Sequence, residues 1–222
     1  VTSETETAGG VSETVTLTET GASTGVFRGS IAMSIGGTAD PNNYLAIAAG
    51  NFVTLTYEDP YNDWGDPVTI TSKVILVGSS VPSGTMTEST TWDIGGSPYL
   101  IAGDINVAHT ATLTIDPGVT VLFLKKSDST SGGQYPTHSE LNIQGVLNAQ
   151  GNSSNPITFT STDTNPTPGD WGRINFSVIS GYTSGTLKHC YISGAKYAVR
   201  IDYGTADVTI DNGYVTLINR RM

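Results

Sequence analysis

The chain is poor in cysteine and in charged residues. Cys190 is the only cysteine among 222 residues, so no disulfide can form within the chain. Only 14% of the residues are charged, compared with about 25% in ordinary soluble domains. Acidic residues outnumber basic ones by 20 to 10, which gives a net charge of -10. This charge argues against nucleic acid and anionic membranes as partners, because both bind basic patches.

Long apolar runs and helical periodicity are also missing. No segment approaches the ~20 consecutive apolar residues that a membrane-spanning helix needs, so we expect no membrane insertion. The chain begins at Val1 rather than Met, which indicates a removed leader or a trimmed chain. We therefore expect an extracellular or cell-surface protein. Cys190 either pairs with another chain or lies buried as a small hydrophobic residue, and we favour burial.

The chain instead contains many stretches in which Thr alternates with Val, Ile or Leu. Such alternation predicts half-buried strands, because successive side chains of a strand point to opposite faces. Residues 15–18, 52–57 and 68–74 are runs of this kind, separated by Gly-rich and Asp-Pro turns. The pattern predicts an all-β protein in which residues 1–78 form a small β-sandwich.

Three motifs in this first part carry a family resemblance. Residues 13–21 (ETVTLTETG), 24–31 (TGVFRGSI) and 54–60 (TLTYEDP) resemble immunoglobulin-like repeats of prokaryotic surface proteins. The resemblance implies a spacer or assembly module without catalysis. Such repeats usually open with a further strand, and Val1 lies almost at the second one. We therefore expect either a missing strand or a sheet edge that something else completes.

Residues 79–91 are rich in Ser, Thr, Pro and Gly, and we place the domain boundary there. The segment is predicted to be either a flexible connector or an extended segment laid along the next domain. From residue 92 to 222, short apolar runs recur between Gly, Asn and Asp-Pro corners. Very short strands that each need a covering neighbour are typical of a solenoid.

Four sequence motifs of this second part are more specific than the recurrence of its short apolar runs. Residues 113–121 (LTIDPGVTV), 145–151 (GVLNAQG), 155–161 (NPITFTS) and 169–174 (GDWGRI) resemble successive coils of right-handed parallel β-helix proteins of secreted bacterial type. In such a helix Pro117-Gly118 would form a corner, and Ile115, Val119 and Val121 would point into the bore. The resemblance implies a fold for residues 92–222 but no single function, since the family includes adhesins, passenger segments and polysaccharide enzymes.

Few residues suggest chemistry. Oxygen ligands are dense enough to hold calcium in one acidic loop, although its spacing is not that of an EF-hand and a solvated hairpin loop is the alternative. The candidate ligands are Asp59, Asn62, Asp63 and Asp66. The three histidines are scattered, and among the carboxylates only Asp202, with Arg200 nearby, suggests polysaccharide chemistry. We therefore expect no catalytic residues, no cofactor other than this calcium ion, and no enzyme.

The two ends of the chain motivate a functional hypothesis. A β-helix that stops without a cap exposes strand edges and bore residues, and natural proteins avoid such edges or use them for assembly. The residues expected to mediate assembly are Val1, Thr2, Val208, Ile210, Val215 and Leu217. The leading hypothesis is a subunit of an extracellular filament that polymerises with copies of itself by strand addition. The alternatives are a carbohydrate-binding adhesin with a surface polysaccharide as ligand, a fragment of a larger surface protein and, less favoured, a polysaccharide lyase or hydrolase.

Overall fold

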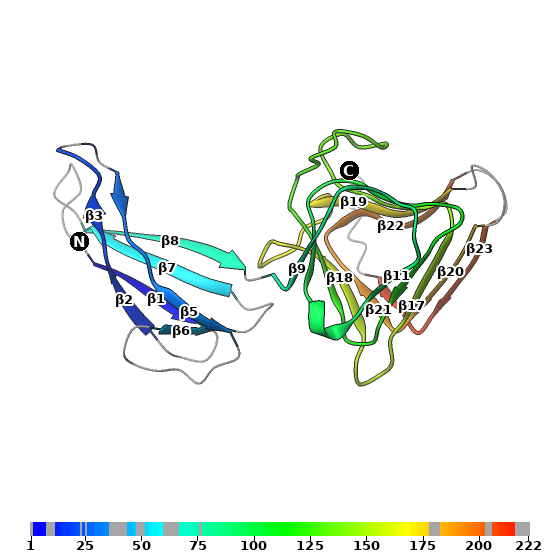
Figure 1. Cartoon of the computed structure of the whole chain (residues 1–222), viewed down its shortest axis with the longest axis horizontal. Helices are drawn as coiled ribbons and strands as arrows, with labels where there is room; N and C mark the ends of the chain where they lie inside the picture. The colour runs from blue at the N-terminus through cyan, green and yellow to red at the C-terminus, as the bar shows by residue number, and fades with distance from the viewer. Residues whose placement is uncertain are drawn as a thin grey trace. The chain divides into compact units, whose positions relative to one another are not determined.

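The computed structural model describes residues 2–7, 12–22, 24, 26–35, 44–47, 52–59, 67–75, 77–177, 183–202 and 206–215. These residues form β-strands and one short 3-10 helix, η1 (Ile94–Gly96). The chain divides into two compact units, Val1–Leu76 and Val77–Met222, which are drawn in Figure 1. None of the described segments is a helix long and apolar enough to cross a membrane.

The N-terminal unit contains an antiparallel four-stranded sheet in the order β2-β1-β7-β8. Its strands are β1 (Thr2–Thr7), β2 (Ser12–Thr16), β7 (Phe52–Asp59) and β8 (Val68–Ile75). Two further pairs are β3 (Thr18–Glu19) with β4 (Phe27–Arg28), which is antiparallel, and β5 (Ala32–Ile35) with β6 (Tyr44–Ile47), which is parallel. The all-β prediction is confirmed, whereas the immunoglobulin-like sandwich stays a prediction.

The first described strand, β1, is an inner strand of this sheet. It lies between β2 and β7 and pairs with both, through Thr5 with Glu13 on one side and Thr5 with Leu55 on the other. The edges of the described sheet are therefore β2 and β8, and a strand added at an edge stays a prediction.

The C-terminal unit is a parallel β-helix built from three sheets, which surround a common interior in Figure 1. The first sheet contains β9 (Ser79–Val81), β12 (Tyr99–Ile101), β15 (Thr120–Phe123), β18 (Ile157–Ser161), β21 (Cys190–Ile192) and β24 (Tyr214–Val215). The second contains β10 (Gly84–Met86), β13 (Ile105–Val107), β16 (Leu141–Ile143), β19 (Trp171–Ser177) and β22 (Ala195–Asp202). The third contains β11 (Thr90–Trp92), β14 (Thr112–Ile115), β17 (Val146–Gln150), β20 (Thr183–Lys188) and β23 (Ala206–Asp211).

Residues 79–91 form the first coil of this helix rather than a connector. β9, β10 and β11 pair in parallel with β12, β13 and β14, respectively. The polar composition of these residues suggested a linker, but main-chain hydrogen bonds to the next coil order them. The helix therefore begins about thirteen residues earlier than the sequence analysis placed it, as the division after Leu76 also indicates.

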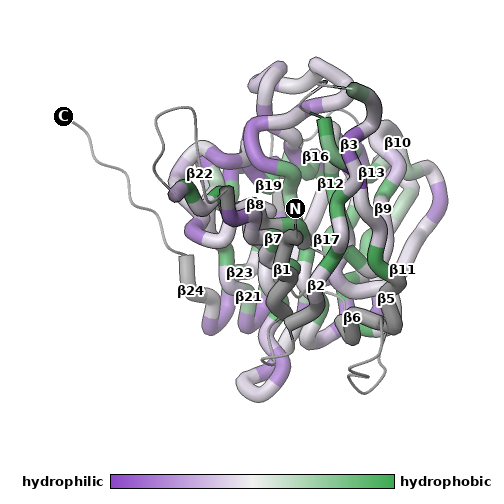
Figure 2. Tube along the Cα trace, turned by 90° about the vertical axis from the view of Figure 1, so that its left-hand side faces the viewer, coloured by the Kyte–Doolittle hydropathy of each residue, from purple (hydrophilic) through white to green (hydrophobic). Residues whose placement is uncertain are grey.

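The bore of the helix is filled by apolar side chains stacked in register from coil to coil. Ile105, Leu141 and Ile174 are successive partners in the second sheet, and each is 0% exposed. Phe123 and Trp171 stack with ring centroids 3.8 Å apart. In Figure 2 hydrophobic residues follow strands such as β12 and β17, and hydrophilic stretches lie on connecting segments. Each fully buried Leu, Ile or Phe contributes roughly 1.5–3 kcal/mol, so this stack is the main source of stability in the unit.

A corner at His189 separates β20 from β21. His189 adopts a left-handed conformation with φ of 47°, so the chain passes there from the third sheet to the first. Cys190 then lies inside the helix, 2% exposed, and burial raises the pKa of its thiol to about 12. The expectation that Cys190 is buried is confirmed.

Candidate functional site

The outer surface of the second sheet carries a ladder of amide side chains. Asn106, Asn142 and Asn175 are register partners in β13, β16 and β19, and their chain neighbours point into the bore. The Asn175 Nδ2 donates a hydrogen bond to Asn142 Oδ1 at 3.4 Å. Arg200 of β22 is the register partner of Asn175 and continues the ladder. We call this surface, together with the charged and aromatic side chains described next, the polar face.

A chain of ion pairs crosses the polar face. The Arg173 Nε donates to Glu140 Oε1 at 2.7 Å, and both side chains are buried. Arg173 Nη1 lies 3.1 Å from Asp202 Oδ2, and Asp202 also pairs with Arg200. The hydrogen bond from Arg200 to Asp202 raises the pKa of that guanidinium above its usual value. The face therefore alternates carboxylates and guanidinium groups, with Arg173 and Glu140 at its buried end.

Two buried carboxylates anchor the loop 124–140 beside this face. Asp104 Oδ1 accepts a hydrogen bond from the Glu140 backbone N–H at 2.8 Å, and Glu140 Oε2 accepts one from the Gln134 N–H at 2.7 Å. Burial, together with the nearby charges of Asp128 and Glu140, raises the pKa of Asp104 to about 6, although the hydrogen bond from Glu140 opposes this shift. The same loop is drawn beside β19 in Figure 1.

Aromatic rings complete the polar face. Tyr135 of the loop stacks with Tyr197 of β22 at a ring-centroid distance of 6.1 Å. The Lys196 Nζ lies 4.1 Å from the centroid of the Tyr135 ring, and the Arg173 guanidinium carbon lies 5.5 Å from it. Tyr197 is 40% exposed, so its ring remains accessible to a ligand. Burial and the neighbouring Tyr197 raise the pKa of Tyr135 above its usual value.

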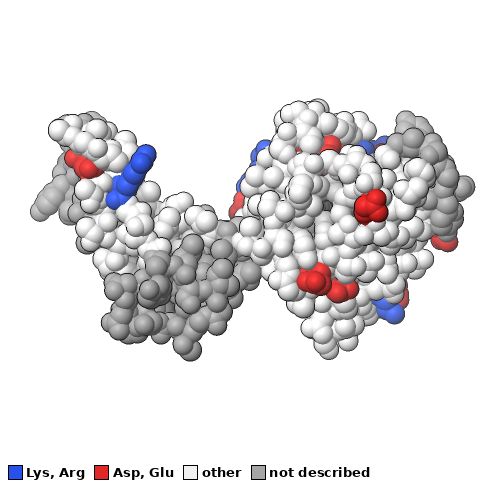
Figure 3. Space-filling model, in the orientation of Figure 1, with Lys and Arg blue, Asp and Glu red and all other residues white. Residues whose placement is uncertain are grey.

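Among the described side chains, Asn175 Oδ1 of this face and Ser139 Oγ of the loop are buried without a hydrogen-bond partner in the protein. Arg173 Nη1 is not free, because it lies 3.1 Å from Asp202 Oδ2 in an ion pair. Planar amide, carboxylate and guanidinium groups beside an exposed ring can bind a sugar. Figure 3 shows how sparse charged side chains are elsewhere on the surface that it displays.

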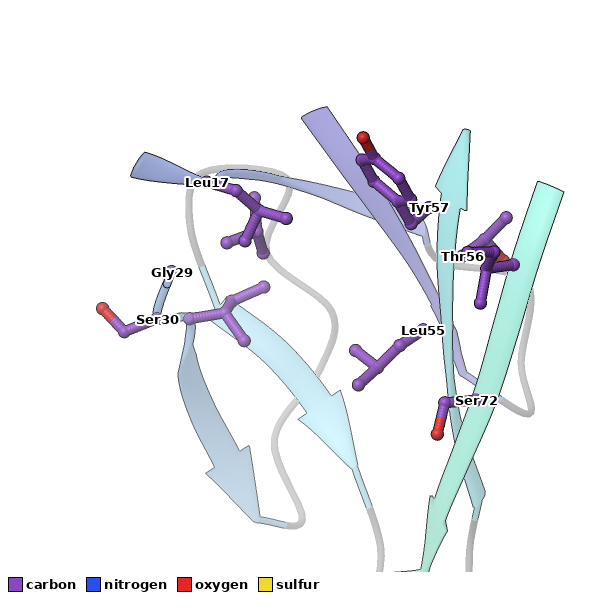
Figure 4. A pocket seen from close by; sticks show the side chains of 10 residues that line it. Leu17, Gly29, Ser30, Leu55, Thr56, Tyr57 and Ser72 are labelled. Atoms are coloured by element: carbon purple, nitrogen blue, oxygen red, sulfur yellow. The ribbon is translucent and has the colours of Figure 1, made fainter. Parts of the chain in front are cut away.

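Two further hollows among the described residues were compared with the polar face. In the N-terminal unit, a pocket of 290 Å³ lies between β7 and β8 on one side and Leu17 and residues 29–31 on the other, and Leu17 and Leu55 are among its lining residues in Figure 4. Its lining is mostly apolar. In the helix unit, a groove of 400 Å³ runs over the outer surface of the third sheet, where Thr112, Asn148 and Thr186 contribute to its lining. Neither hollow combines charged, aromatic and unpaired polar groups as the polar face does.

The predicted calcium ligands fall largely outside the described residues. Asp59 is the last residue of β7, and Asn62, Asp63 and Asp66 are among the residues that the structure does not describe. Within the described part of the chain, no group of three or more His, Cys, Asp or Glu side chains is placed to hold a metal ion. Calcium binding by the acidic loop therefore stays a prediction.

The predicted assembly residues belong to both units. Thr2 begins β1, which is paired on both sides, whereas Val1 and Leu217 lie outside the described residues. Val208 and Ile210 belong to β23, and Val215 ends β24; these strands are the last members of their sheets. Assembly through these residues stays a prediction.

Of the polar face, only Arg200 and Asp202 could be identified from the sequence. Asp104, Glu140, Arg173 and Tyr135 were missed because they come from three different coils and from the long loop 124–140. One signal was present, since three short strands have Asn in the middle between apolar residues: INV at 105–107, LNI at 141–143 and INF at 174–176. Aligning these triplets gives the register of the second sheet and the ladder on its surface.

Comparisons with known proteins agree with this architecture. Comparison with curated proteins and with solved structures gave no match. The family model described as a pectate-lyase-like beta helix domain matches residues 84–218, which is more than half of the chain and includes the whole polar face. The fold of this family occurs in both enzymes and non-enzymes. The parallel sheets and this match together show that the chain belongs to the pectate-lyase-like β-helix family.

Proposed function

We propose that this chain is part of an extracellular, cell-surface protein that binds a polysaccharide on the polar face of its β-helix. The observation that carries the proposal is the convergence of Asn175, Arg173, Asp202 and Tyr197 on one surface. The N-terminal unit then serves as a spacer, as expected for an immunoglobulin-like repeat.

The chemistry of these groups suits sugars better than proteins or nucleic acids. Sugar hydroxyls both donate and accept hydrogen bonds, and Asn, Asp and Arg offer fixed donors and acceptors for them. A hydrogen bond to a charged group is roughly twice as strong as one between neutral groups, which favours ligands that reach Asp202 or Arg200. An exposed ring such as Tyr197 provides an apolar surface for the C–H groups of a sugar. The net charge of -10 disfavours nucleic acid.

The role that we propose is binding without catalysis. Asp104 and Glu140 are buried and accept hydrogen bonds from the loop backbone, and Asp202 is paired with two guanidinium groups. A glycosidase needs two carboxylates on either side of an accessible bond, and a general acid or base needs access to the proton that it moves. A reducing-end assay on each polysaccharide that binds is the direct check, and steady release of shorter chains would contradict this part of the proposal.

Affinity electrophoresis through gels that contain neutral or acidic polysaccharides tests the binding itself. We expect at least one polysaccharide to retard the protein, and Tyr197→Ala to weaken that binding about tenfold, the equivalent of ~1.4 kcal/mol. Tyr191→Ala is the matched control, because Tyr191 is 42% exposed but lies in β21 of the first sheet. Equal losses in the two variants, or no retardation by any polysaccharide, would contradict the proposal.

Self-assembly is a second candidate, supported by one observation. Ile201 and Ile210 are partners of the bore residues Phe176 and Leu187, yet each is 50% exposed. In a β-helix such a layer is covered by a further coil, by a cap or by another subunit. Light scattering with negative-stain electron microscopy distinguishes these possibilities. Regular fibres that shorten in an Ile210→Lys variant would support assembly, whereas a monomer at high concentration would exclude it.

A further inference from the structure

The tip of the loop 124–140, residues 130–138, is attached to the coils through side chains. In the described chain, the backbone-to-backbone hydrogen bonds of these residues stay within the loop. The Gln134 N–H instead donates to the Glu140 carboxylate, at 2.7 Å from Oε2. The position of the tip, which carries Tyr135, therefore depends on side-chain charge rather than on pairing within a sheet.

Two carboxyl groups converge beneath this tip at Gly133. A Cβ added to Gly133 would lie 2.1 Å from Glu140 Oε2 and 2.6 Å from Asp104 Oδ2, so these two oxygens are close neighbours. Both side chains are buried, and the residues are 0% and 4% exposed. Two buried carboxyl groups this close together repel each other when both are charged, which favours a proton on one of them.

Glu140 has a counter-ion, whereas Asp104 makes no ion pair among the described side chains. The Arg173 Nε donates to Glu140 Oε1 at 2.7 Å, and the same guanidinium pairs with Asp202, so Arg173 is already shared between two carboxylates. Asp104 Oδ1 accepts a hydrogen bond from the Glu140 backbone N–H. Of the two carboxyl groups at Gly133, Asp104 is therefore the one that takes up the proton.

The remaining groups that face Asp104 do not stabilise its charge. Asp128 of the loop is a third carboxylate; burial disfavours its charge, but hydrogen bonds from Thr130 and Gly132 outweigh burial and lower the pKa of Asp128. Asp128 therefore stays charged and repels a charge on Asp104. From β10, the Gly84 N–H donates to the backbone carbonyl of Asp104. Burial and the two neighbouring carboxylates raise the pKa of Asp104 to about 6.

We propose that the loop 124–140 is a pH-operated latch over the polar face, and that Asp104 is its trigger. With a proton on Asp104, the repulsion from Glu140 is absent, and the tip holds Tyr135 against Tyr197. When Asp104 releases this proton to solvent, the two carboxylates repel each other and the tip moves away from β22. Opening uncovers Arg173, whose guanidinium carbon lies 5.5 Å from the Tyr135 ring centroid in the closed position.

The direction of the pH dependence follows from which position binds the proton. Asp104 has a pKa of about 6 in the closed position and, once the tip opens, its ordinary value of about 4. The closed position is therefore favoured in mildly acidic solution, and it loses this advantage as the pH rises through 6. We expect the closed-to-open ratio to fall about tenfold from pH 5 to pH 7.

Amide hydrogen exchange of the whole chain, followed by NMR at pH 5 and pH 7, tests the latch. Protection factors, which correct for the intrinsic pH dependence of exchange, report the closed-to-open ratio at the Gln134 amide. We expect this protection factor to fall about tenfold between the two pH values, and to stay below that of the core amides of β15 at both. This measurement needs no variant and no ligand.

Two substitutions assign the effect to Asp104. Asp104→Asn keeps an acceptor for the Glu140 N–H but carries no charge, so the protection factor of Gln134 should differ less than about twofold between the two pH values. His138→Gln is the matched control, because His138 is another titratable side chain of the tip and packs edge-on against the Tyr135 ring. The tenfold fall should persist in this variant. Thermal melts at pH 5 check that each variant is folded.

Three results would overturn the latch. A protection factor of Gln134 that does not change with pH in the wild-type chain would show that no proton operates the tip. Persistence of the fall in Asp104→Asn, or its loss in His138→Gln, would assign the proton to another group. Equal protection of Gln134 and of the core amides of β15 would show that the tip opens only when the whole unit unfolds.

Discussion

The two units are built from similar residues, but they bury them very differently. Thr, Val, Ile and Leu alternate along strands in both. In the helix unit, Leu113, Leu147 and Leu187 are all 0% exposed. In the N-terminal unit, Leu55 is 39% and Ile70 56% exposed, although both belong to a continuous four-stranded sheet.

The difference arises from how each architecture covers its strands. In the inner coils of the helix, apolar residues are stacked between register partners of the coils before and after them, and they face the other two sheets across the bore. In the N-terminal unit, the described residues on one side of the sheet face an open apolar pocket. Alternation in sequence thus predicts which residues share a face, but the covering element decides whether that face is buried.

The same substitution in the two units should give the largest contrast. Leu147→Ala removes a fully buried side chain and should lower the free energy of unfolding of the helix unit by roughly 2–5 kcal/mol. Leu55→Ala removes a side chain that is already 39% exposed beside a pocket, so we expect a loss below about 1 kcal/mol. Urea denaturation monitored by hydrogen exchange reports on each unit. Similar losses at the two positions would refute the difference in packing.

A second contrast lies within the helix unit, at two glycines that both have positive φ. Gly133 has φ of 60°, and an added Cβ would lie 2.1 Å from Glu140 Oε2 and 2.6 Å from Asp104 Oδ2. Gly169 has φ of 88° and open space around it. We expect Gly133→Ala to destabilise the unit by about 3 kcal/mol and Gly169→Ala by about 1 kcal/mol, the cost of the backbone conformation alone. Equal decreases in melting temperature for the two variants would contradict this, because they would show that the loop accommodates the Gly133→Ala methyl group without displacing Glu140 and Asp104.

The features that the sequence predicted correctly are those that depend on neighbouring residues in the chain. Ile115, Val119 and Val121 were expected in the bore and are 1%, 0% and 0% exposed. The Pro117-Gly118 corner is also confirmed, with Gly118 at φ of 85°. A corner residue and alternating apolar positions depend only on neighbouring residues, so they can be read from one segment.

Where the sequence failed, the missing information was long-range. The composition of residues 79–91 fitted both a flexible connector and an extended segment laid along the next domain, and the hydrogen bonds that order them come from β12, β13 and β14. The polar face was missed because Arg173 and Glu140 are 33 residues apart, and a long loop precedes one of them. Such pairings follow from the register of the coils, which loops of unequal length conceal.

A smaller expected effect is the pH dependence of the stability of the helix unit, which Asp104 should cause. The pKa of Asp104 is raised to about 6, so between about pH 4 and 6 the folded state binds a proton that the unfolded state has released. Asp104 therefore makes the unit more stable at pH 5 than at pH 7, by about 1 kcal/mol. Asp104→Asn should remove this difference while keeping an acceptor for the Glu140 N–H. Denaturation at the two pH values measures it, and an unchanged pH dependence in the variant would contradict the assignment.

The rate at which a thiol reagent labels Cys190 compares the two units most directly. A substitution in the helix unit should change this rate, whereas a substitution in the N-terminal unit should not. Cys190 lies only in the helix unit, 2% exposed and with a thiol pKa of about 12, so a thiol reagent should label it at least ~10³-fold more slowly than an exposed cysteine. Leu147→Ala should accelerate labelling, since it lowers the free energy of opening around that thiol. Leu55→Ala should leave the labelling rate unchanged within about twofold, because it alters no part of the helix core. Equal acceleration of labelling by Leu55→Ala and Leu147→Ala would show that the two units unfold together. The difference in packing would then not give each unit its own free energy of unfolding.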